Sequence, residues 1–213
     1  RGGKDLRGKF MRENGADFEQ IKKELGEKAA SENIPIIRGT ERELLLRAAS
    51  LVQPRKILEI GTAVGYSALL LAERFPFSET DTIEINEKRH KTALEVMKRA
   101  GLSERVHCHL GDASSLISSL QGPYDFVFLD GPKGQYLRHL QMIESLLAEK
   151  AVIAADNVLF RGLVRMFGPV EHRYRTIVVR LREYLSYVEK NYDTVIYEEG
   201  DGLAVSVRKE KGK

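Results

Sequence analysis

The stretch KILEIGTAVGYS, residues 56–67, decides the fold class. Its first five residues, Lys56–Ile60, form a short apolar run that is typical of a buried strand. Gly61 and Gly65 follow, and a helical pattern begins at about residue 65. Glycines let the backbone turn tightly and approach a ligand closely where a helix starts. The stretch therefore predicts the first strand, loop and helix of a parallel α/β sheet.

The same alternation continues along the chain. Further strands are expected at residues 81–85, 105–110, 125–129 and 151–155, between helices near 65–75, 87–100, 114–120 and 135–148. The C-terminal region departs from this order, because a helix over 172–190 precedes a hairpin with strands 194–198 and 203–208. Its turn, Gly200-Asp201-Gly202, requires an antiparallel pair. The fold class is therefore α/β, with a mostly parallel seven-stranded sheet and helices on both faces.

Two helices are expected before the first strand. Apolar residues at helical spacing indicate one over residues 16–33. Thr40 and Glu43 have capping-box spacing, so a second helix should begin there and run to about Val52, before Pro54. No second core is evident. We expect a single domain, residues 1–213, with N-terminal helices in 1–53 and an α/β core in 54–213.

Composition narrows the class of protein. The chain has 213 residues, 31% of them charged, and a single cysteine, Cys108, so it is not a disulfide scaffold. No apolar run approaches the roughly 20 residues needed to span a bilayer. Arg1-Gly2-Gly3-Lys4 does not lead into an apolar signal core. These features favour a cytoplasmic protein without a membrane partner.

The net charge of +3 hides an uneven distribution. Residues 1–13 hold five Lys or Arg against two acids, residues 161–190 hold seven against three, and residues 208–213 hold four against one. Basic segments are often plain solvated surface. Three of them beside an acidic remainder favour a polyanionic partner.

Polar residues and a glycine stand at the carboxyl ends of all five predicted parallel strands, where open α/β sheets bind ligands. They are Gly61, Glu84, Asp112, Asp130 and Asp156. Glu84 lies 23 residues beyond Gly61, at the spacing of an acid that accepts from ribose hydroxyls. Ala63 takes the middle glycine position of the dinucleotide motif, which disfavours a nicotinamide dehydrogenase. The pattern predicts a nucleoside site.

A second pattern predicts a metal site at the same edge. Asp130 is followed 26 residues later by Asp156 and Asn157, and oxygen ligands of this kind suit Mg²⁺. The alternative is that Asp156 and Asn157 cap a turn and that Asp130 is an ordinary strand-end acid. Lys133 would add a cation beside the site. The histidines compete poorly as ligands; His139, in a charge-rich helical context, is expected to face solvent.

Five motifs together resemble the metal-dependent class I S-adenosylmethionine O-methyltransferases of the catechol and caffeoyl-CoA type. They are Ile34–Ile37, Glu59–Ser67, Asp130-x-x-Lys133-Gly134-Gln135-Tyr136, Asp156–Gly162 and Gly200–Leu203. Gly131-Pro132 departs from the family pattern, which more often has two alanines there. Within this family the chain is most similar to the bacterial tRNA 5-hydroxyuridine methyltransferases, which methylate the wobble uridine to 5-methoxyuridine.

The resemblance implies roles for particular residues. Asp130 and Lys133 would be catalytic, and Asp130, Asp156 and Asn157 would bind Mg²⁺. S-adenosylmethionine would be held by Ile37, Glu59, Gly61, Gly65, Ser67, Glu84, Asp112, Ala113 and Asp130.

The substrate and assembly follow from the same resemblance. A tRNA anticodon loop would be the partner, with its phosphates on Arg161, Arg165, Arg173 and Arg175, and a homodimer is expected. One alternative is the same chemistry on a small catechol or caffeoyl-CoA-like substrate. Another is a cofactor-binding module without catalysis.

Overall fold

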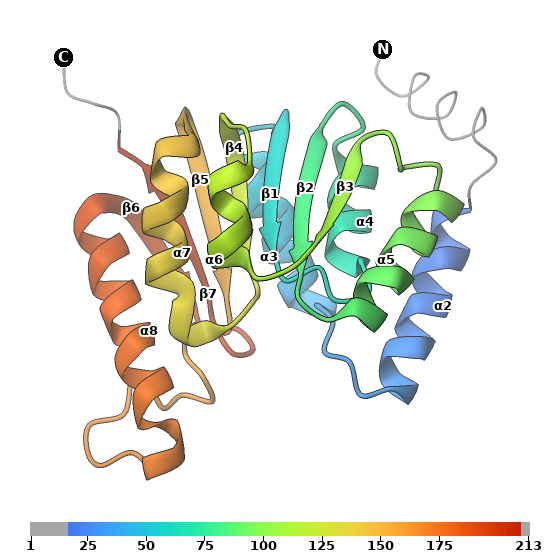
Figure 1. Ribbon diagram of the computed structural model, residues 1–213. Coiled ribbons are helices and arrows are strands. Elements are labelled where there is room, and N and C mark those ends of the chain that lie inside the picture. Colours follow the sequence, from blue (N-terminus) through green and yellow to red (C-terminus); the bar gives the residue numbers. More distant parts are fainter. Residues whose placement is uncertain (1–16, 210–213) are drawn as a thin grey trace.

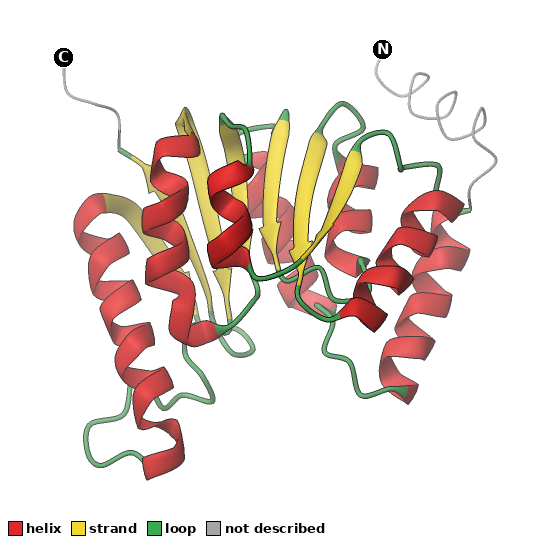
Figure 2. Ribbon diagram, viewed as in Figure 1, coloured by secondary structure: helices red, strands yellow, loops and turns green. Residues whose placement is uncertain are grey.

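The computed structural model describes residues 17–209, which form one seven-stranded sheet with helices on both faces (Figures 1 and 2). The strand order is β3-β2-β1-β4-β5-β7-β6. The strands are β1 (Lys56–Ile60), β2 (Glu79–Glu84), β3 (Val106–Leu110), β4 (Tyr124–Leu129), β5 (Leu147–Asp156), β6 (Tyr192–Tyr197) and β7 (Leu203–Arg208). The main helices are α2 (Phe18–Ser31), α3 (Gly39–Ser50), α4 (Tyr66–Arg74), α5 (Glu87–Arg99), α6 (Ala113–Leu116), α7 (Tyr136–Ile143) and α8 (His172–Asn191).

The predicted sheet is confirmed. Strands β1 to β5 pair in parallel, and β7 pairs antiparallel with both β5 and β6. The strand order reverses between β1 and β4, where the chain runs outward to β2 and β3 and then returns. Such a switch point leaves a crevice at the carboxyl ends of the strands, and ligands bind there in open α/β sheets.

Apolar side chains cover the sheet on both faces. On one face, Tyr136, Leu140 and Ile143 of α7 and Leu181 of α8 belong to a single buried cluster with the central strands. The other face is covered by clusters that include residues of α2, α3, α4 and α5. Strands β1 and β4 are buried on both sides, which explains their continuous apolar sequences.

Two local predictions are wrong. The helix expected over 135–148 ends at Ile143, and after a short 3₁₀ turn β5 begins at Leu147, four residues before the expected start. Leu147 pairs with Tyr124, so a long-range contact decides a segment whose apolar pattern suits either structure. The capping box is also absent: α3 begins at Gly39, and its N-cap is Arg38, which makes no side-chain cap hydrogen bond.

The structure tests the expectations about the basic segments and about membrane helices only for the residues that it describes. Of the basic segments, residues 1–13 and 210–213 lie outside the described residues. Within residues 17–209, no helix is long and apolar enough to cross a bilayer.

Candidate active site

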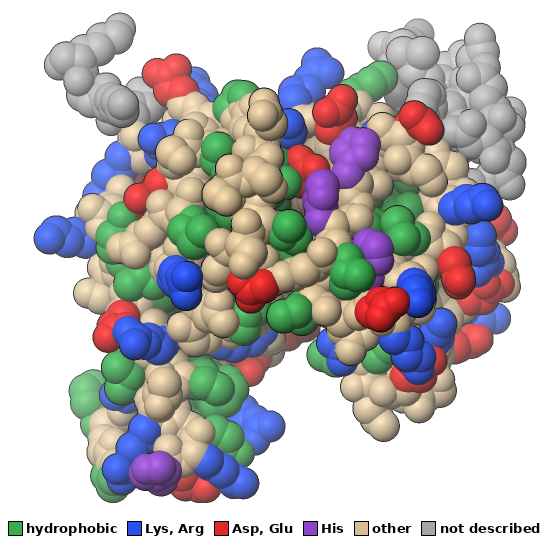
Figure 3. All heavy atoms as spheres, viewed as in Figure 1, with side chains coloured by type: hydrophobic (Ala, Val, Ile, Leu, Met, Phe, Trp, Pro, Cys, Tyr) green, Lys and Arg blue, Asp and Glu red, His purple; other side chains and the backbone are tan. Residues whose placement is uncertain are grey.

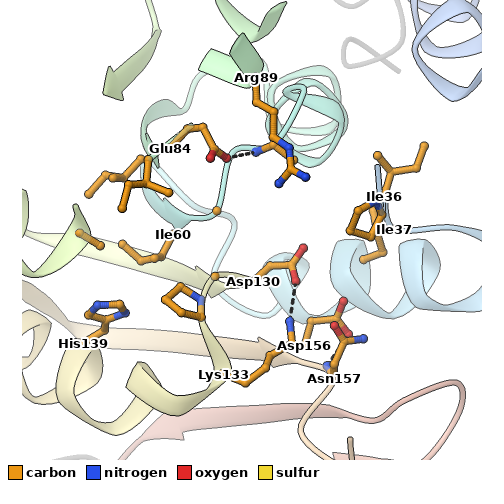
Figure 4. A pocket seen from close by; sticks show the side chains of 18 of the residues that line it. Ile36, Ile37, Ile60, Glu84, Arg89, Asp130, Lys133, His139, Asp156 and Asn157 are labelled. Carbon is orange, nitrogen blue, oxygen red and sulfur yellow. Dashed lines mark hydrogen bonds and ion pairs between the residues drawn. The ribbon is translucent and has the colours of Figure 1, made fainter. Parts of the chain in front are cut away.

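A cavity of about 480 Å³ opens at the carboxyl ends of the parallel strands (Figure 4). It brings together nine of the predicted site residues, which come from segments far apart in the sequence. They are Ile37, Gly61, Glu84, Asp112, Ala113, Asp130, Lys133, Asp156 and Asn157. Three other predicted residues, Glu59, Gly65 and Ser67, do not line the cavity.

The loop after β1 is shaped by its glycine and by Glu84. Gly61 has a φ of +103°, and a Cβ atom there would lie 2.5 Å from the carbonyl oxygen of Asp130. The backbone N–H of Ala63 donates to Oε2 of Glu84 at 2.8 Å, and that of Asn86 donates to Oε1 at 2.8 Å. Both carboxylate oxygens are therefore fixed in place, and each retains a lone pair that can accept from a diol.

Glu59 and Ser67 lie behind this loop in a buried polar network. The hydroxyl of Ser67 donates to Glu59, as does that of Thr82 at 2.5 Å, and the hydroxyls of Thr82 and Thr62 are 2.6 Å apart. Burial raises the pKa of the Glu59 carboxyl to about 7, against the effect of these hydrogen bonds. The network ties β1, β2 and α4 together beneath the loop, so these residues support the cavity without facing it.

The acidic end of the cavity is formed by neighbouring strands. Asp130 follows β4 and Asp156 ends β5, and the preceding residues, Leu129 and Ala155, are register partners. Burial, and then the charge of Asp130, raise the pKa of Asp156 to about 7. Burial also raises the pKa of Asp130, although Lys133, whose Nζ lies 3.2 Å from Oδ1, opposes this effect. The two carboxyl groups lie in surroundings that disfavour their negative charge.

Asn157 completes this end of the cavity. Its backbone N–H donates to Oδ1 of Asp156 at 2.8 Å, and its φ of +54° turns the chain sharply after β5. The hydroxyl of the buried Tyr136 donates to the backbone carbonyl of Asp156 at 2.9 Å. Two carboxylates and an amide oxygen fit a hard divalent cation such as Mg²⁺, which would also stabilise the two negative charges. No cluster of three or more His, Cys, Asp or Glu side chains suited to a metal occurs in residues 17–209.

Three residues with titratable side chains that sequence reasoning did not assign to the site also line the cavity: Glu41, Arg89 and His139. Glu41 comes from α3, and its charge contributes to the raised pKa values of Asp130 and Asp156. No local sequence pattern marks Glu41 as a site residue, because Asp130 and Asp156 lie far from it in the sequence. His139 is fully buried, so the expectation that it faces solvent is wrong. Its helical spacing from Tyr136 and Ile143, both on the buried face of α7, could have revealed this.

The four arginines expected to bind RNA lie outside the cavity, in the segment after β5 and at the start of α8. This part of the chain protrudes at the lower left of Figures 1 and 3, where blue side chains gather. Arg161 donates to the hydroxyl of Tyr174 at 3.2 Å, Arg165 pairs with Glu198, and Arg173 pairs with Glu171. Arg175 donates to the carbonyl of Val170. All four lie within residues 161–175, as does Phe167, which is fully exposed.

Comparisons with known proteins agree with this architecture. The O-methyltransferase family model matches residues 12–209, and the chain belongs to this family. It is 28% identical over 200 residues to a caffeoyl-CoA O-methyltransferase of Medicago sativa, covering 87% of this chain and 81% of the relative. It is 33% identical over 128 residues to a catechol O-methyltransferase of Mycobacterium tuberculosis, covering 59% of this chain and 58% of that one.

A solved structure extends the comparison to the fold. The O-methyltransferase from Bacillus cereus in complex with SAH superposes with a TM-score of 0.78 at 25% identity. The match covers 89% of this chain and 91% of the Bacillus cereus chain. The Rossmann-like methyltransferase fold expected from the sequence is therefore confirmed.

Proposed function

We propose that this protein transfers a methyl group from S-adenosylmethionine to a ring hydroxyl that stands beside a second oxygen atom. The observation that carries the proposal is that one cavity is lined both by Glu84, whose carboxylate can accept from a diol, and by the oxygen-bearing side chains of Asp130, Asp156 and Asn157. Glu84 supports the nucleoside end, and Asp130, Asp156 and Asn157 form the other end. A related enzyme from Bacillus cereus binds SAH, the product form of this cofactor.

Different residues of the cavity bind the cofactor and the cation in this proposal. Glu84 accepts hydrogen bonds from the ribose hydroxyls, and Ile37, Asp112 and Ala113 line the walls beside the cofactor. Asp130, Asp156 and Asn157 would hold Mg²⁺. Such an ion would lower the pKa of a neighbouring hydroxyl and stabilise an oxyanion. The rate gain supplied by the protein comes mainly from the placement of the nucleophilic oxygen in line with the methyl group.

Lys133 is placed to handle charge or a proton at the reacting oxygen. Its Nζ lies 3.2 Å from Asp130 and 5.6 Å from the centroid of the Tyr136 ring, within the cavity wall. A lysine acts as a general base only when its ammonium group has lost a proton, and otherwise stabilises an anion through its charge. We assign Lys133 to the substrate hydroxyl in one of these two capacities.

A small catechol-type molecule is the substrate class that the relatives favour. The similar proteins from Medicago sativa and Mycobacterium tuberculosis are named for caffeoyl-CoA and catechol. Both names describe an aromatic ring with neighbouring oxygens, and such a pair can chelate one metal ion. The acidic end of the cavity suits this geometry.

A tRNA carrying 5-hydroxyuridine is the second candidate, and the protruding arginines favour it. A hydroxyl beside a carbonyl on the pyrimidine ring offers the same chelating pair of oxygens. The cluster of Arg161, Arg165, Arg173 and Arg175 would meet backbone phosphates of a single-stranded loop. Phe167, fully exposed in the same segment of the chain, offers a ring on which a base can stack.

One assay tests both candidates. The protein is incubated with labelled S-adenosylmethionine and, in parallel, with catechol, caffeoyl-CoA and hydroxylated tRNA, each with and without EDTA. Mass spectrometry identifies the product. Chelator-sensitive methylation of a small catechol supports the first candidate, and 5-methoxyuridine in tRNA supports the second. If no substrate with paired oxygens is methylated, the proposal is wrong.

A further inference from the structure

His139 lies at the end of the cavity away from the acidic residues. It comes from α7, is fully buried, and lines the same cavity as Gly111, Asp112 and Ala113. In Figure 4, its ring stands on one side of Asp130, whereas Asn157 stands on the other. If the ribose binds at Glu84 and the methyl group points to the acidic end, this opposite end receives the base.

The hydrogen bonds around His139 define its tautomer. Nε2 lies 3.2 Å from Oγ of Ser114, and the Ser114 hydroxyl donates to Oε1 of Gln135 at 3.2 Å. With the hydroxyl hydrogen in that bond, the arrangement is complete when Nε2 carries the ring hydrogen and donates to Ser114. Burial lowers the pKa of the imidazole, so the ring is neutral near pH 7. Nδ1 is then an acceptor with a free lone pair.

Nδ1 has no hydrogen-bond partner. In residues 17–209, three buried side-chain polar atoms lack a partner: Oγ1 of Thr80, Nδ1 of His139 and the hydroxyl oxygen of Tyr184. Of these three residues, only His139 lines the cavity. A buried acceptor without a donor destabilises a protein, so such atoms call for an explanation. A ligand that brings a hydrogen-bond donor to this wall of the cavity would explain why Nδ1 of His139 has no partner.

We propose that Nδ1 of His139 accepts a hydrogen bond from the 6-amino group of the cofactor's adenine. The proposal rests on the cofactor assigned above. On the adenine base, the ring nitrogens that remain free are acceptors, and the 6-amino group is the only N–H donor. A lone pair in the wall can therefore match the base only at that group. A 6-oxo purine places an acceptor at the same position, so His139 would select adenine against hypoxanthine.

Calorimetry with two ligands tests this selection. SAH and S-inosylhomocysteine differ in the amino or oxo group at position 6, and both are titrated into the wild type and His139→Phe. The phenyl ring keeps most of the volume and removes the lone pair. The ratio of the two dissociation constants should shrink about tenfold in the variant, the value for one neutral hydrogen bond. The control is His90→Phe, because Nε2 of His90 bonds to the carbonyl of Cys108 and His90 does not line the cavity.

A second measurement needs no variant. In the ¹⁵N NMR spectrum of the wild type, Nδ1 of His139 should appear as an unprotonated nitrogen whose signal shifts with SAH and shifts less with S-inosylhomocysteine. An unchanged ratio in His139→Phe, or a protonated Nδ1, would overturn the assignment while leaving SAH binding intact. Failure of SAH to bind the wild type would instead overturn the proposed function, and this inference with it.

Discussion

The carbonyl oxygen of Asp130 lies 2.5 Å from the position that a Cβ atom of Gly61 would occupy. The loop after β1 and the end of β4 are thus packed backbone against backbone. The two halves of the proposed site, for nucleoside and for cation, meet at this contact. We therefore expect a substitution in one half of the site to alter ligand binding in the other half.

Replacement of Gly61 tests this coupling. Gly61→Ala places a methyl group against Asp130 and strains a φ of +103°, so we expect weaker binding of both SAH and Mg²⁺, by at least about tenfold. Calorimetry measures both. The matched control is Gly26→Ala in α2, where nothing lies within 4 Å of the added Cβ. It should leave both affinities unchanged and stabilise the protein by about 0.5–1 kcal/mol. Normal SAH and Mg²⁺ binding in Gly61→Ala would contradict the coupling.

The Asp156→Asn variant distinguishes cation binding from cofactor binding. The variant loses a negative charge at the acidic end, so we expect Mg²⁺ affinity to fall at least about tenfold while SAH affinity changes little. In the wild type, Mg²⁺ affinity should rise as the pH increases through about 7, because proton and cation compete for Asp156. Calorimetry at pH 6 and 8 measures this. Asp193→Asn, at an exposed position of β6, is the control. Equal Mg²⁺ affinity in the wild type and Asp156→Asn would exclude Asp156 as a ligand.

The buried carboxyl of Glu59 should make stability depend on pH. Its pKa is about 7 in the folded protein and near 4.5 in the unfolded chain. Between these values the folded state binds more protons, so the free energy of unfolding falls as pH rises, by about 3 kcal/mol in total. Glu59→Gln removes this contribution. Guanidinium titrations at pH 5 and 8 should show a smaller loss of stability in the variant than in the wild type; equal losses would refute the assignment.

Charge reversal on the protruding segment tests the RNA candidate. Arg173→Glu/Arg175→Glu should raise the apparent KM for tRNA and spare SAH binding, because both side chains lie outside the cavity. The control is Lys98→Glu/Lys190→Glu, which changes the net charge equally on α5 and at the end of α8. If the arginine variant leaves the KM for tRNA unchanged, or if both variants raise it equally, this segment does not bind RNA.

The sheet and most of the cavity residues could be predicted from the sequence because the patterns that mark strands and strand ends are local. A strand-end residue such as Asp130 or Glu84 is visible in the order of strand, turn and helix. Glu41 was missed because it reaches the site only through the packing of α3, and the start of β5 was misplaced because Tyr124 decides it. Glu59 and Ser67, which were expected to hold the cofactor, are buried behind the glycine loop, and the sequence motif alone does not show this burial.

The position of β7 has a consequence for the order in which the protein takes shape. Strand β7 lies between β5 and β6, and its first residue, Leu203, is the register partner of Asp156. It is also the last described strand in the chain, so a ribosome synthesises it after all the residues that line the cavity. Until it emerges, the outer edge of β5 has no partner strand. Folding of a nascent chain could therefore form the nucleoside end of the cavity before β7 covers the edge of β5 beside the acidic end.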